Sequence, residues 1–273
     1  MDTITVRPLT PVIGAELDGI DLRKPLDADT FRQIHAALLE HQAIFFRDQD
    51  IPVEKHKELG AWFGELVAHP NEPGVEGHPE VMIIHADASS VRVAGERYHS
   101  DVSCSPEPPM GSILRIHTLP DVGGDTVFVS MYAAYDALSE GMKRYLEGLT
   151  AIHDGAPYYR DVNERVGRDD TGRTFPRAEH PVIRTHPETG RKAIFVNEMF
   201  TTRVAGVPRA EGDAVLRFLY DHVKRPEFQC RFRWQKNSIA FWDNRCVQHS
   251  AIWDYFPAVR SGHRVTIKGD RPV

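Results

Sequence analysis

Short apolar runs separated by turn-forming residues dominate the hydrophobic pattern of this chain. Ala43–Phe46 and Val81–Ile84 are continuous apolar runs of the length that buried strands have. From Phe228 to Trp234 apolar and polar residues alternate, which is typical of a half-buried strand. Pro187–Gly190 separates two further runs and predicts a hairpin. The other expected strands lie at Ile4–Val6, Ile113–Ile116, Val127–Val129, Ile239–Trp242 and Val265–Ile267.

Helical spacing of apolar residues is confined to a few segments. Asp27 is a candidate N-cap for a helix whose apolar face includes Ile34 and Leu38. A second helix is expected to end at Gly64, and a third to begin after Ser139 and extend to Leu149. Many strands with few helices predict a mostly β fold with helical insertions (α+β), built as a β-sandwich or jelly roll.

Residues 155–178 are polar, rich in Arg, Asp and Gly, and show no clear period. This composition predicts an irregular, mobile loop, and we expect it to cover the functional site. The whole chain, residues 1–273, shows no internal repeat and is expected to form a single domain.

The overall composition excludes several classes of partner. A formal charge of −6 at pH 7 gives no reason to expect nucleic acid or an anionic membrane surface. No apolar run approaches the roughly 20 residues that a membrane span needs, and no signal-peptide segment is recognisable. The 3 cysteines form no CxxC pair, which favours a reducing, cytoplasmic location. A small molecule is the expected partner.

The pattern with the most chemical content is His99-Ser100-Asp101 together with the distant His249. In an extended segment, side chains two residues apart share a face, so His99 and Asp101 can bind one ion. Two imidazoles and one carboxylate leave open coordination positions, the arrangement of mononuclear non-haem Fe(II) oxygenases.

Two alternatives compete with this metal site. His85-Ala86-Asp87 repeats the same short pattern, so one of the two matches is expected to be coincidental. Cys104 and Cys246 could join His99 and His249 in a tetrahedral zinc site, but the closely spaced ligand pairs of structural zinc sites are missing. Buried, inert thiols are the simpler interpretation.

Arginines near the end of the chain are candidates for binding an anion. Arg264 lies on the polar face of the expected strand around Val265, and Arg260 precedes it. Their simplest interpretation is a solvated basic face. A jelly roll would instead turn one face toward the barrel mouth, where guanidinium groups suit a dicarboxylate cosubstrate. Thr126 could add a hydroxyl donor to the same anion.

Taken together, these motifs resemble the Fe(II)/2-oxoglutarate-dependent dioxygenases of the taurine dioxygenase and phenoxyacetate dioxygenase family, and within it most closely the taurine dioxygenases. The likeness covers nearly the whole chain and favours His99 over His85. The matching stretches include Phe63–Leu66, Tyr98–Val102, Gly123–Thr126, Phe195–Glu198, Phe200–Arg203, Trp242–Arg245 and Arg264–Thr266.

The resemblance implies a double-stranded β-helix (jelly-roll) core flanked by helices, and it implies Fe(II), 2-oxoglutarate and O2 as cofactor and cosubstrates. Iron would be held by His99, Asp101 and His249. Arg260 and Thr126 would bind the distal carboxylate of 2-oxoglutarate. His69, Phe200 and Arg264 would bind the substrate. Arg264 would face its anionic end.

The family pattern is not kept in the substrate pocket. Glu72 and Gly95 stand where a tyrosine and an asparagine are expected, and Tyr158 and Tyr159 replace a serine-phenylalanine pair. The expected reaction is therefore hydroxylation next to a small anionic group, most simply in an organosulfonate other than taurine, with release of sulfite and an aldehyde. Alkyl sulfate esters or aryloxyalkanoates are alternatives, and a zinc-dependent hydrolase on the same ligands is a distant one. The family is often dimeric or tetrameric, so a homodimer or homotetramer is expected.

Overall fold

The computed structural model describes residues 4–273 of the chain. Its helices are α1 (Ala28–His41), α2 (Val53–Ala61), α3 (Met131–Asp136), α4 (Glu140–Leu146), α5 (Ala156–Arg165), α6 (Arg209–Val223) and the short 3-10 helix η1 (Pro226–Phe228). Its strands are β1 (Thr5–Pro8), β2 (Ala15–Asp18), β3 (Ala43–Phe46), β4 (Gly74–Val75), β5 (His78–Ala86), β6 (Gly111–Thr118), β7 (Thr126–Ser130), β8 (Thr150–Asp154), β9 (Arg177–Pro181), β10 (Ile183–Thr185), β11 (Lys192–Ile194), β12 (Thr201–Val204), β13 (Gln229–Phe232), β14 (Ser238–Asp243), β15 (Val247–Ala251) and β16 (Arg260–Ile267).

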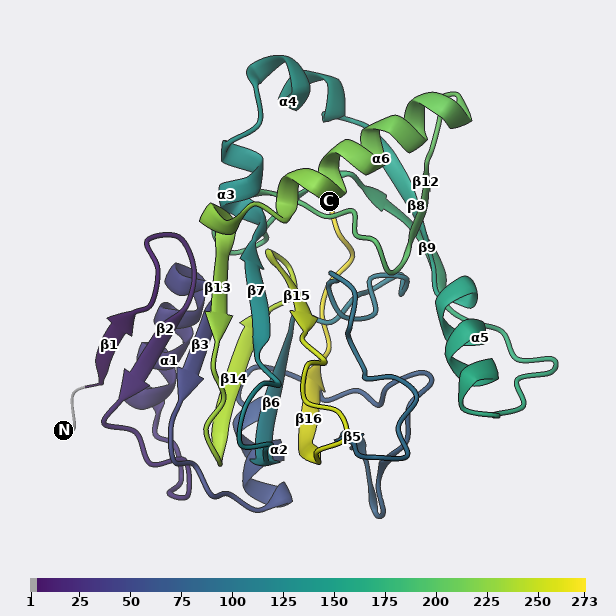
Figure 1. The fold of residues 1–273 in the computed structure, drawn as a ribbon. Coiled ribbons are helices and arrows are strands. Elements are labelled where there is room, and N and C mark those ends of the chain that lie inside the picture. Colours follow the sequence, from purple (N-terminus) through teal and green to yellow (C-terminus); the bar gives the residue numbers. More distant parts are fainter. Residues whose placement is uncertain (1–3) are drawn as a thin grey trace.

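Two sheets packed face to face make up the body of the molecule (Figure 1). The larger sheet has 8 strands in the order β1-β2-β3-β14-β6-β16-β5-β4, and the smaller has the order β13-β7-β15. Phe128 of the small sheet packs against Phe45 and Trp242 of the large one, with ring centroids 5.4 and 5.5 Å apart. The main core therefore lies between the sheets.

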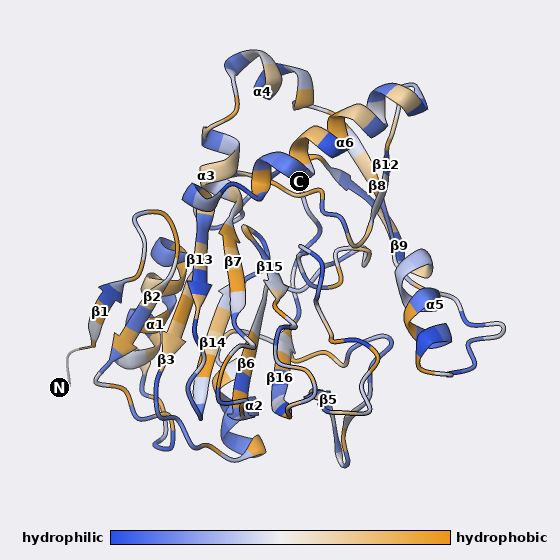
Figure 2. Ribbon diagram, in the orientation of Figure 1, coloured by the Kyte–Doolittle hydropathy of each residue, from blue (hydrophilic) through white to orange (hydrophobic). Residues whose placement is uncertain are grey.

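A second core lies on the other face of the large sheet, under α1 and α2. Ile34 and Leu38 of α1 pack there with Ile44, whereas the neighbouring Phe45 points into the main core. Both faces of β3 are thus buried, which explains why its sequence is apolar throughout. Figure 2 shows this concentration of hydrophobic residues on β3 and β7.

The remaining elements cover one end of the two sheets. Helices α3, α4 and α6 lie together there, and the small sheet β12-β8-β9 runs from them toward α5 (Figure 1). Helix α6 packs on β12, and His222 near its end bonds the carbonyl of Ala134 in α3 over 2.8 Å. No helix within residues 4–273 is both long enough and apolar enough to cross a membrane.

The architecture confirms a mostly β protein with helical insertions. Local signals were reliable where a cap or turn defined them: Asp27 accepts from the Thr30 amide over 2.7 Å, Ser139 accepts from the Met142 amide over 3.2 Å, and β10 pairs with β11.

Three expected element boundaries are wrong. Helix α2 ends at Ala61 rather than at Gly64, because the Phe63 amide bonds the Gly60 carbonyl and tightens the last turn. Helix α4 ends at Leu146 rather than at Leu149, since Gly148 has a φ of 79°.

The third correction concerns 155–178, because its first part is not an irregular loop: Ala156–Arg165 forms α5. Tyr159, Val162 and Asn163 share its buried face. Because two of these three buried residues are a tyrosine and an asparagine, the spacing of aliphatic residues alone does not indicate a helix here.

Candidate metal centre

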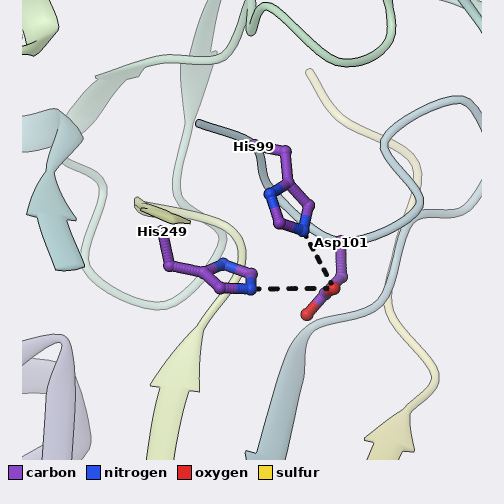
Figure 3. A group of neighbouring side chains, drawn as sticks. All are labelled: His99, Asp101 and His249. Carbon is purple, nitrogen blue, oxygen red and sulfur yellow. Dashed lines mark ion pairs between the residues drawn. The ribbon is translucent and has the colours of Figure 1, made fainter. Parts of the chain in front are cut away.

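Main-chain pairing brings the two candidate histidine ligands together. His99 and His249 form an isolated antiparallel bridge, with N–O distances of 3.1 and 2.9 Å, and their ring centroids are 4.2 Å apart. Asp101 follows two residues after His99. Its Oδ1 lies 3.6 Å from His99 Nε2 and 4.0 Å from His249 Nε2 (Figure 3). All three side chains are buried, and their ligand atoms could contact a single ion.

Neighbouring groups orient each of these side chains. His99 Nδ1 donates to the Arg97 carbonyl over 2.7 Å, because a carbonyl can only accept, and this leaves a lone pair on the Nε2 that faces Asp101. The Asp101 Oδ2 accepts from the Ser112 hydroxyl over 2.8 Å. The Asp101 amide donates to Asn244 Oδ1, which also accepts from Trp242 Nε1. The stretch around Trp242 and Asn244 therefore supports the site from behind.

The charge states of Asp101 and His249 suit a divalent cation. Burial favours a neutral Asp101 carboxyl, but the Arg264 guanidinium, 2.6 Å away, outweighs it and holds the pKa of Asp101 well below its ordinary value. Burial holds the pKa of His249 well below its ordinary value, so its ring is neutral. Neutral imidazole and ionised carboxylate are the forms that bind metals. The donor set thus fits an Fe(II)-type ion.

A buried cavity of about 40 Å³ adjoins the candidate metal ligands and ends at an unpaired arginine. Arg260 is only 4% exposed, its Nε donates to the Gly124 carbonyl over 3.1 Å, and its Nη2 has no partner. Thr126 Oγ1 accepts from Trp234 Nε1 over 3.0 Å, which leaves the threonine hydroxyl proton available. The lining of this cavity includes His99, Thr126, His249, Arg260 and Arg264.

The glycine turn before Thr126 makes room for that arginine. Gly124 has a φ of 74°, and a Cβ there would lie 3.1 Å from the Arg260 Cδ. Gly95 is similarly constrained, with a φ of 80° and a Cβ position 3.1 Å from His99 Cε1. The glycine at 95 therefore also keeps space beside a candidate metal ligand.

A second cavity, of about 30 Å³, shares His99 and Arg264 with the first. His69 lines it and accepts the amides of Asn71 and Glu72 on Nδ1, over 3.1 and 2.9 Å, so its ring proton sits on Nε2. Burial is the main cause that lowers the pKa of His69 to about 3, which keeps the ring neutral. The aromatic wall consists of Phe200, Tyr158 and Tyr159. Every residue of the iron, 2-oxoglutarate and substrate sites that the resemblance implies thus lines one of two cavities that share Arg264.

The competing metal patterns fail. His85 and Asp87 contact each other over 3.3 Å at the surface, with side chains 46% and 35% exposed, and belong to no candidate metal group within residues 4–273. The zinc site with cysteines is also wrong, since Cys246 lies with His186 and Asp243 rather than with His99.

That second group is already saturated. Both Asp243 oxygens accept from Arg245, and one also contacts His186 Nε2 over 3.0 Å. His186 Nδ1 accepts the amides of Glu188 and Thr189. Since the Asp243 oxygens and the His186 ring nitrogens are all engaged in hydrogen bonds, this network has a structural role.

Sequence reasoning missed a charged cluster at the mouth of the second cavity. Arg92 Nη2 lies 2.6 Å from one oxygen of Glu72, and Arg168 Nη2 lies 3.4 Å from the other. These residues are far apart in the sequence and form no motif, so no local signal could have identified the cluster.

Comparisons with known proteins agree with this geometry. The family model "Taurine catabolism dioxygenase TauD, TfdA family" matches residues 5–266. An "Alpha-ketoglutarate-dependent sulfate ester dioxygenase" of Pseudomonas putida is 35% identical over 99% of this chain and 91% of its own length. An "Alkylsulfatase" of Acinetobacter baylyi is 34% identical over 98% of this chain and 86% of its own. A solved taurine dioxygenase from Burkholderia xenovorans is 38% identical, covers 99% of this chain and 91% of its own, and superposes with a TM-score of 0.86.

Proposed function

Because this chain belongs to the taurine catabolism dioxygenase TauD, TfdA family, we propose that it hydroxylates the carbon next to the anionic group of an organosulfonate or a sulfate ester. The family assignment confirms the enzyme class expected from the sequence, a dioxygenase dependent on Fe(II) and 2-oxoglutarate. The single observation that carries the proposal is the convergence of His99, Asp101 and His249 beside an unpaired buried arginine.

His99 Nε2, His249 Nε2 and the Asp101 carboxylate would hold the iron. When bound, Fe(II) supplies O2 activation coupled to the oxidative decarboxylation of 2-oxoglutarate to succinate and CO2. His99 and Asp101 line one of the two cavities, and His99 and His249 line the other, so a ligand in either cavity could reach an ion held there. Their orienting partners would fix the ligand geometry before the ion arrives.

Arg260 and Thr126 would bind the distal carboxylate of 2-oxoglutarate. The free Nη2 of Arg260 and the available Thr126 hydroxyl proton are both donors at the end of a cavity that begins at the metal ligands. A buried guanidinium without a carboxylate partner is costly, so a ligand carboxylate there would be bound strongly. Arg264 borders the same cavity and could also contact the cosubstrate.

Arg264 would orient the primary substrate by its anionic group, with His69 Nε2 as a second donor and Phe200 as an apolar wall. Arg264 now pairs with Asp101 and would exchange that partner for the substrate anion as Asp101 turns to the metal. A hydroxylated sulfonate carbon breaks its C–S bond to give an aldehyde and sulfite, and a sulfate ester gives an aldehyde and sulfate. Anchoring the substrate matters because a displacement of the reacting carbon by about 1 Å can lower the rate about a hundredfold.

Two further proposals concern architecture. The large sheet and the sheet β13-β7-β15, with the site between their ends, support a double-stranded β-helix (jelly-roll) core. The expected homodimer or homotetramer stays a prediction, which light scattering would test.

Succinate formation and O2 uptake, measured with Fe(II), 2-oxoglutarate and a panel of sulfonates, sulfate esters and aryloxyalkanoates, test the activity. Sulfite or sulfate release that requires both O2 and 2-oxoglutarate is the expected result. Release that persists without O2 would support the zinc hydrolase instead. The Asp101→Ala variant should lose turnover, and a variant with unchanged turnover would refute the assigned metal site.

A further inference from the structure

Four polar side chains behind the substrate pocket form a closed cycle of hydrogen bonds. They are Ser103, His153, Asn197 and Thr201, and the first three are fully buried. Asn197 Nδ2 lies 2.8 Å from Ser103 Oγ, which lies 3.0 Å from His153 Nδ1. His153 Nε2 lies 3.4 Å from Thr201 Oγ1, which accepts the Asn197 amide over 2.9 Å. The proposed function assigns this Ser103 network no role.

The side-chain orientation of Asn197 fixes the direction of every bond in the Ser103 network. The Phe200 main-chain amide donates to Asn197 Oδ1 over 3.0 Å, so the amide nitrogen of the side chain must face Ser103. Ser103 Oγ then accepts from Asn197 and donates its own proton to His153 Nδ1. The proton of the imidazole therefore sits on Nε2 and points to Thr201 Oγ1.

The network requires a neutral His153, whose Nδ1 can accept. Burial is the main cause that lowers the pKa of His153 to about 3, so the neutral form is present at pH 7. A phenylalanine would occupy nearly the same space but could not accept a hydrogen bond. The hydrogen bonds, rather than the packing, therefore distinguish a histidine at this position.

The Ser103 network connects segments that are far apart in the sequence, and two of them carry residues of the candidate site. Ser103 follows the candidate metal ligand Asp101 by two residues, and His153 lies on β8. Asn197 precedes the turn that ends at Phe200. The network thus ties the segment of a metal ligand to the segment of the pocket wall.

Phe200 takes its main-chain position from this network. Its amide donates to Asn197 Oδ1, and its carbonyl accepts from the Asp154 amide over 2.8 Å, next to His153. Its side chain is buried, and the centroid of its ring lies 6.5 Å from that of His99. Both main-chain groups of Phe200 are therefore held by the network or by the residue beside it.

On the metal side, the network holds a strained backbone in place. Val102, between Asp101 and Ser103, has a φ of 45°, a left-handed conformation that is rare for a β-branched residue. Such a conformation persists only where the surrounding structure holds it. The Asp101 amide donates to Asn244 Oδ1 over 3.1 Å on one side, and the network holds Ser103 on the other.

We propose that His153 and Asn197 are positioning residues that hold Phe200 in a fixed place relative to the metal ligands. They line neither of the two cavities and act through Ser103. This inference rests on the proposed function, in which Phe200 is the apolar wall against which the substrate lies.

Two substitutions of His153 separate hydrogen bonding from packing. His153→Phe keeps an aromatic ring, which can still stack on Phe195 with centroids about as far apart as the present 5.5 Å, but it offers Ser103 no acceptor. A buried hydroxyl without an acceptor is costly, so Ser103 should turn away from Asn197 to find one. His153→Asn leaves a small space, but its amide oxygen can accept in place of Nδ1. A packing role predicts the higher kcat for His153→Phe, and the positioning role predicts it for His153→Asn.

Initial rates of sulfite or sulfate release, expressed per bound iron, compare the variants on the substrate that the parent chain turns over fastest. In His153→Phe, kcat should fall about tenfold, because a displaced wall lets the reacting carbon move. KM should change less than about threefold, since Arg264 and His69, which would bind the anion, lie outside the network. His153→Asn should recover most of the lost kcat. A higher kcat in His153→Phe than in His153→Asn, or a loss through KM alone, would overturn the inference.

Asn197→Leu breaks the network at its other positioning residue. Leucine has nearly the shape of asparagine but removes both the donor to Ser103 and the acceptor of the Phe200 amide. The kcat of this variant should fall at least as far as that of His153→Phe. A kcat equal to that of the parent chain would contradict the positioning role.

His222→Phe is the matched control for the loss of a buried histidine hydrogen bond. His222 Nε2 contacts the Ala134 carbonyl over 2.8 Å, between α6 and α3, and its ring packs on Phe228. This variant should lose stability in urea, as His153→Phe does, but keep the kcat of the parent chain. An equal fall of kcat in both variants would show that the loss of any such bond has this effect, and the inference would fail.

Hydrogen exchange of the metal-free protein gives a readout that needs no turnover. The amides of Asn197, Phe200 and Thr201 all donate to atoms of the same turn. Exchange within residues 195–203 should be faster by about tenfold or more in His153→Phe and Asn197→Leu, because local opening becomes easier, and unchanged in His222→Phe.

The exchange measurement also separates the two proposals. If no sulfonate or sulfate ester is turned over and the exchange pattern holds, the positioning of Phe200 stands and only the proposed function falls. Equal exchange of residues 195–203 in the parent chain and in Asn197→Leu would overturn the inference, whatever the kinetics show.

Discussion

Replacing Arg260 with methionine should stabilise the metal-free protein and weaken 2-oxoglutarate binding at the same time. Arg260 is 4% exposed, has an unpartnered Nη2, and forms no ion pair within residues 4–273. Burial lowers its pKa, which reflects the cost of keeping the charge there. Methionine has a similar length and no polar group, so it removes that cost.

The size of both effects follows from the contacts of this side chain. An unsatisfied buried donor costs about 1–3 kcal/mol, so the free energy of unfolding should rise by about that amount. Its hydrogen bond from Nε to the Gly124 carbonyl and its contact with the Trp234 ring, 5.4 Å from the centroid, are lost and offset part of the gain. The bond from Arg260 Nη2 to the carboxylate would contribute about 1.5–3 kcal/mol, so the Kd for 2-oxoglutarate should rise about tenfold to a hundredfold.

Urea unfolding of the metal-free protein measures the first effect, and calorimetric titration of 2-oxoglutarate into the Fe(II) protein under nitrogen measures the second. The matched control is Arg217→Met, which changes an exposed arginine on α6 and should alter neither quantity. A less stable Arg260→Met protein that binds 2-oxoglutarate normally would refute the assignment of this cavity to the cosubstrate.

Three further variants probe the metal site, the fold and the glycine turn. Asp101→Asn should weaken Fe(II) binding, which metal analysis measures. It should also lower the free energy of unfolding of the metal-free protein by about 3 kcal/mol in urea, because it leaves the Arg264 cation buried without its partner. His56→Gln should flatten the pH dependence of stability. Burial lowers the pKa of His56 from 6.5 to about 4 while the ring contacts the Ile113 carbonyl over 3.0 Å, so the neutral form is the native one. As the pH falls, the unfolded chain takes up the proton first. The contribution of His56 to the free energy of unfolding is therefore fully present above pH 6.5, and about 3 kcal/mol is lost as the pH falls toward 4. Gly124→Ala should cost about 1 kcal/mol or more of stability and weaken 2-oxoglutarate binding, because the residue has a φ of 74° and the new Cβ would press on a cosubstrate donor.

Each of these three has a contrary outcome. Unchanged iron content in Asp101→Asn would exclude this carboxylate as a ligand. A pH profile of His56→Gln identical to that of the parent chain would show that His56 does not titrate with folding. Normal 2-oxoglutarate affinity in Gly124→Ala would show that the turn does not position the cosubstrate site.

The amino-acid sequence alone determined the features that depend on local spacing. The apolar runs gave the strands, Asp27 and Ser139 gave two helix starts, and the His99–Asp101 spacing gave two of the three candidate ligands. Family resemblance then distinguished this pattern from the similar one at His85, which no local rule could do.

Tertiary structure decided everything that depends on residues distant in the chain. Strand pairing sets His249 opposite His99, and only the folded chain shows that Arg264 pairs with Asp101 whereas Nη2 of Arg260 is left without a partner. The pairing of Arg92 and Arg168 with Glu72 likewise joins three separate segments. The sequence specifies side-chain type and spacing. Burial and the choice of partner depend on how the chain packs, and burial and partner together determine the charge that each titratable group carries.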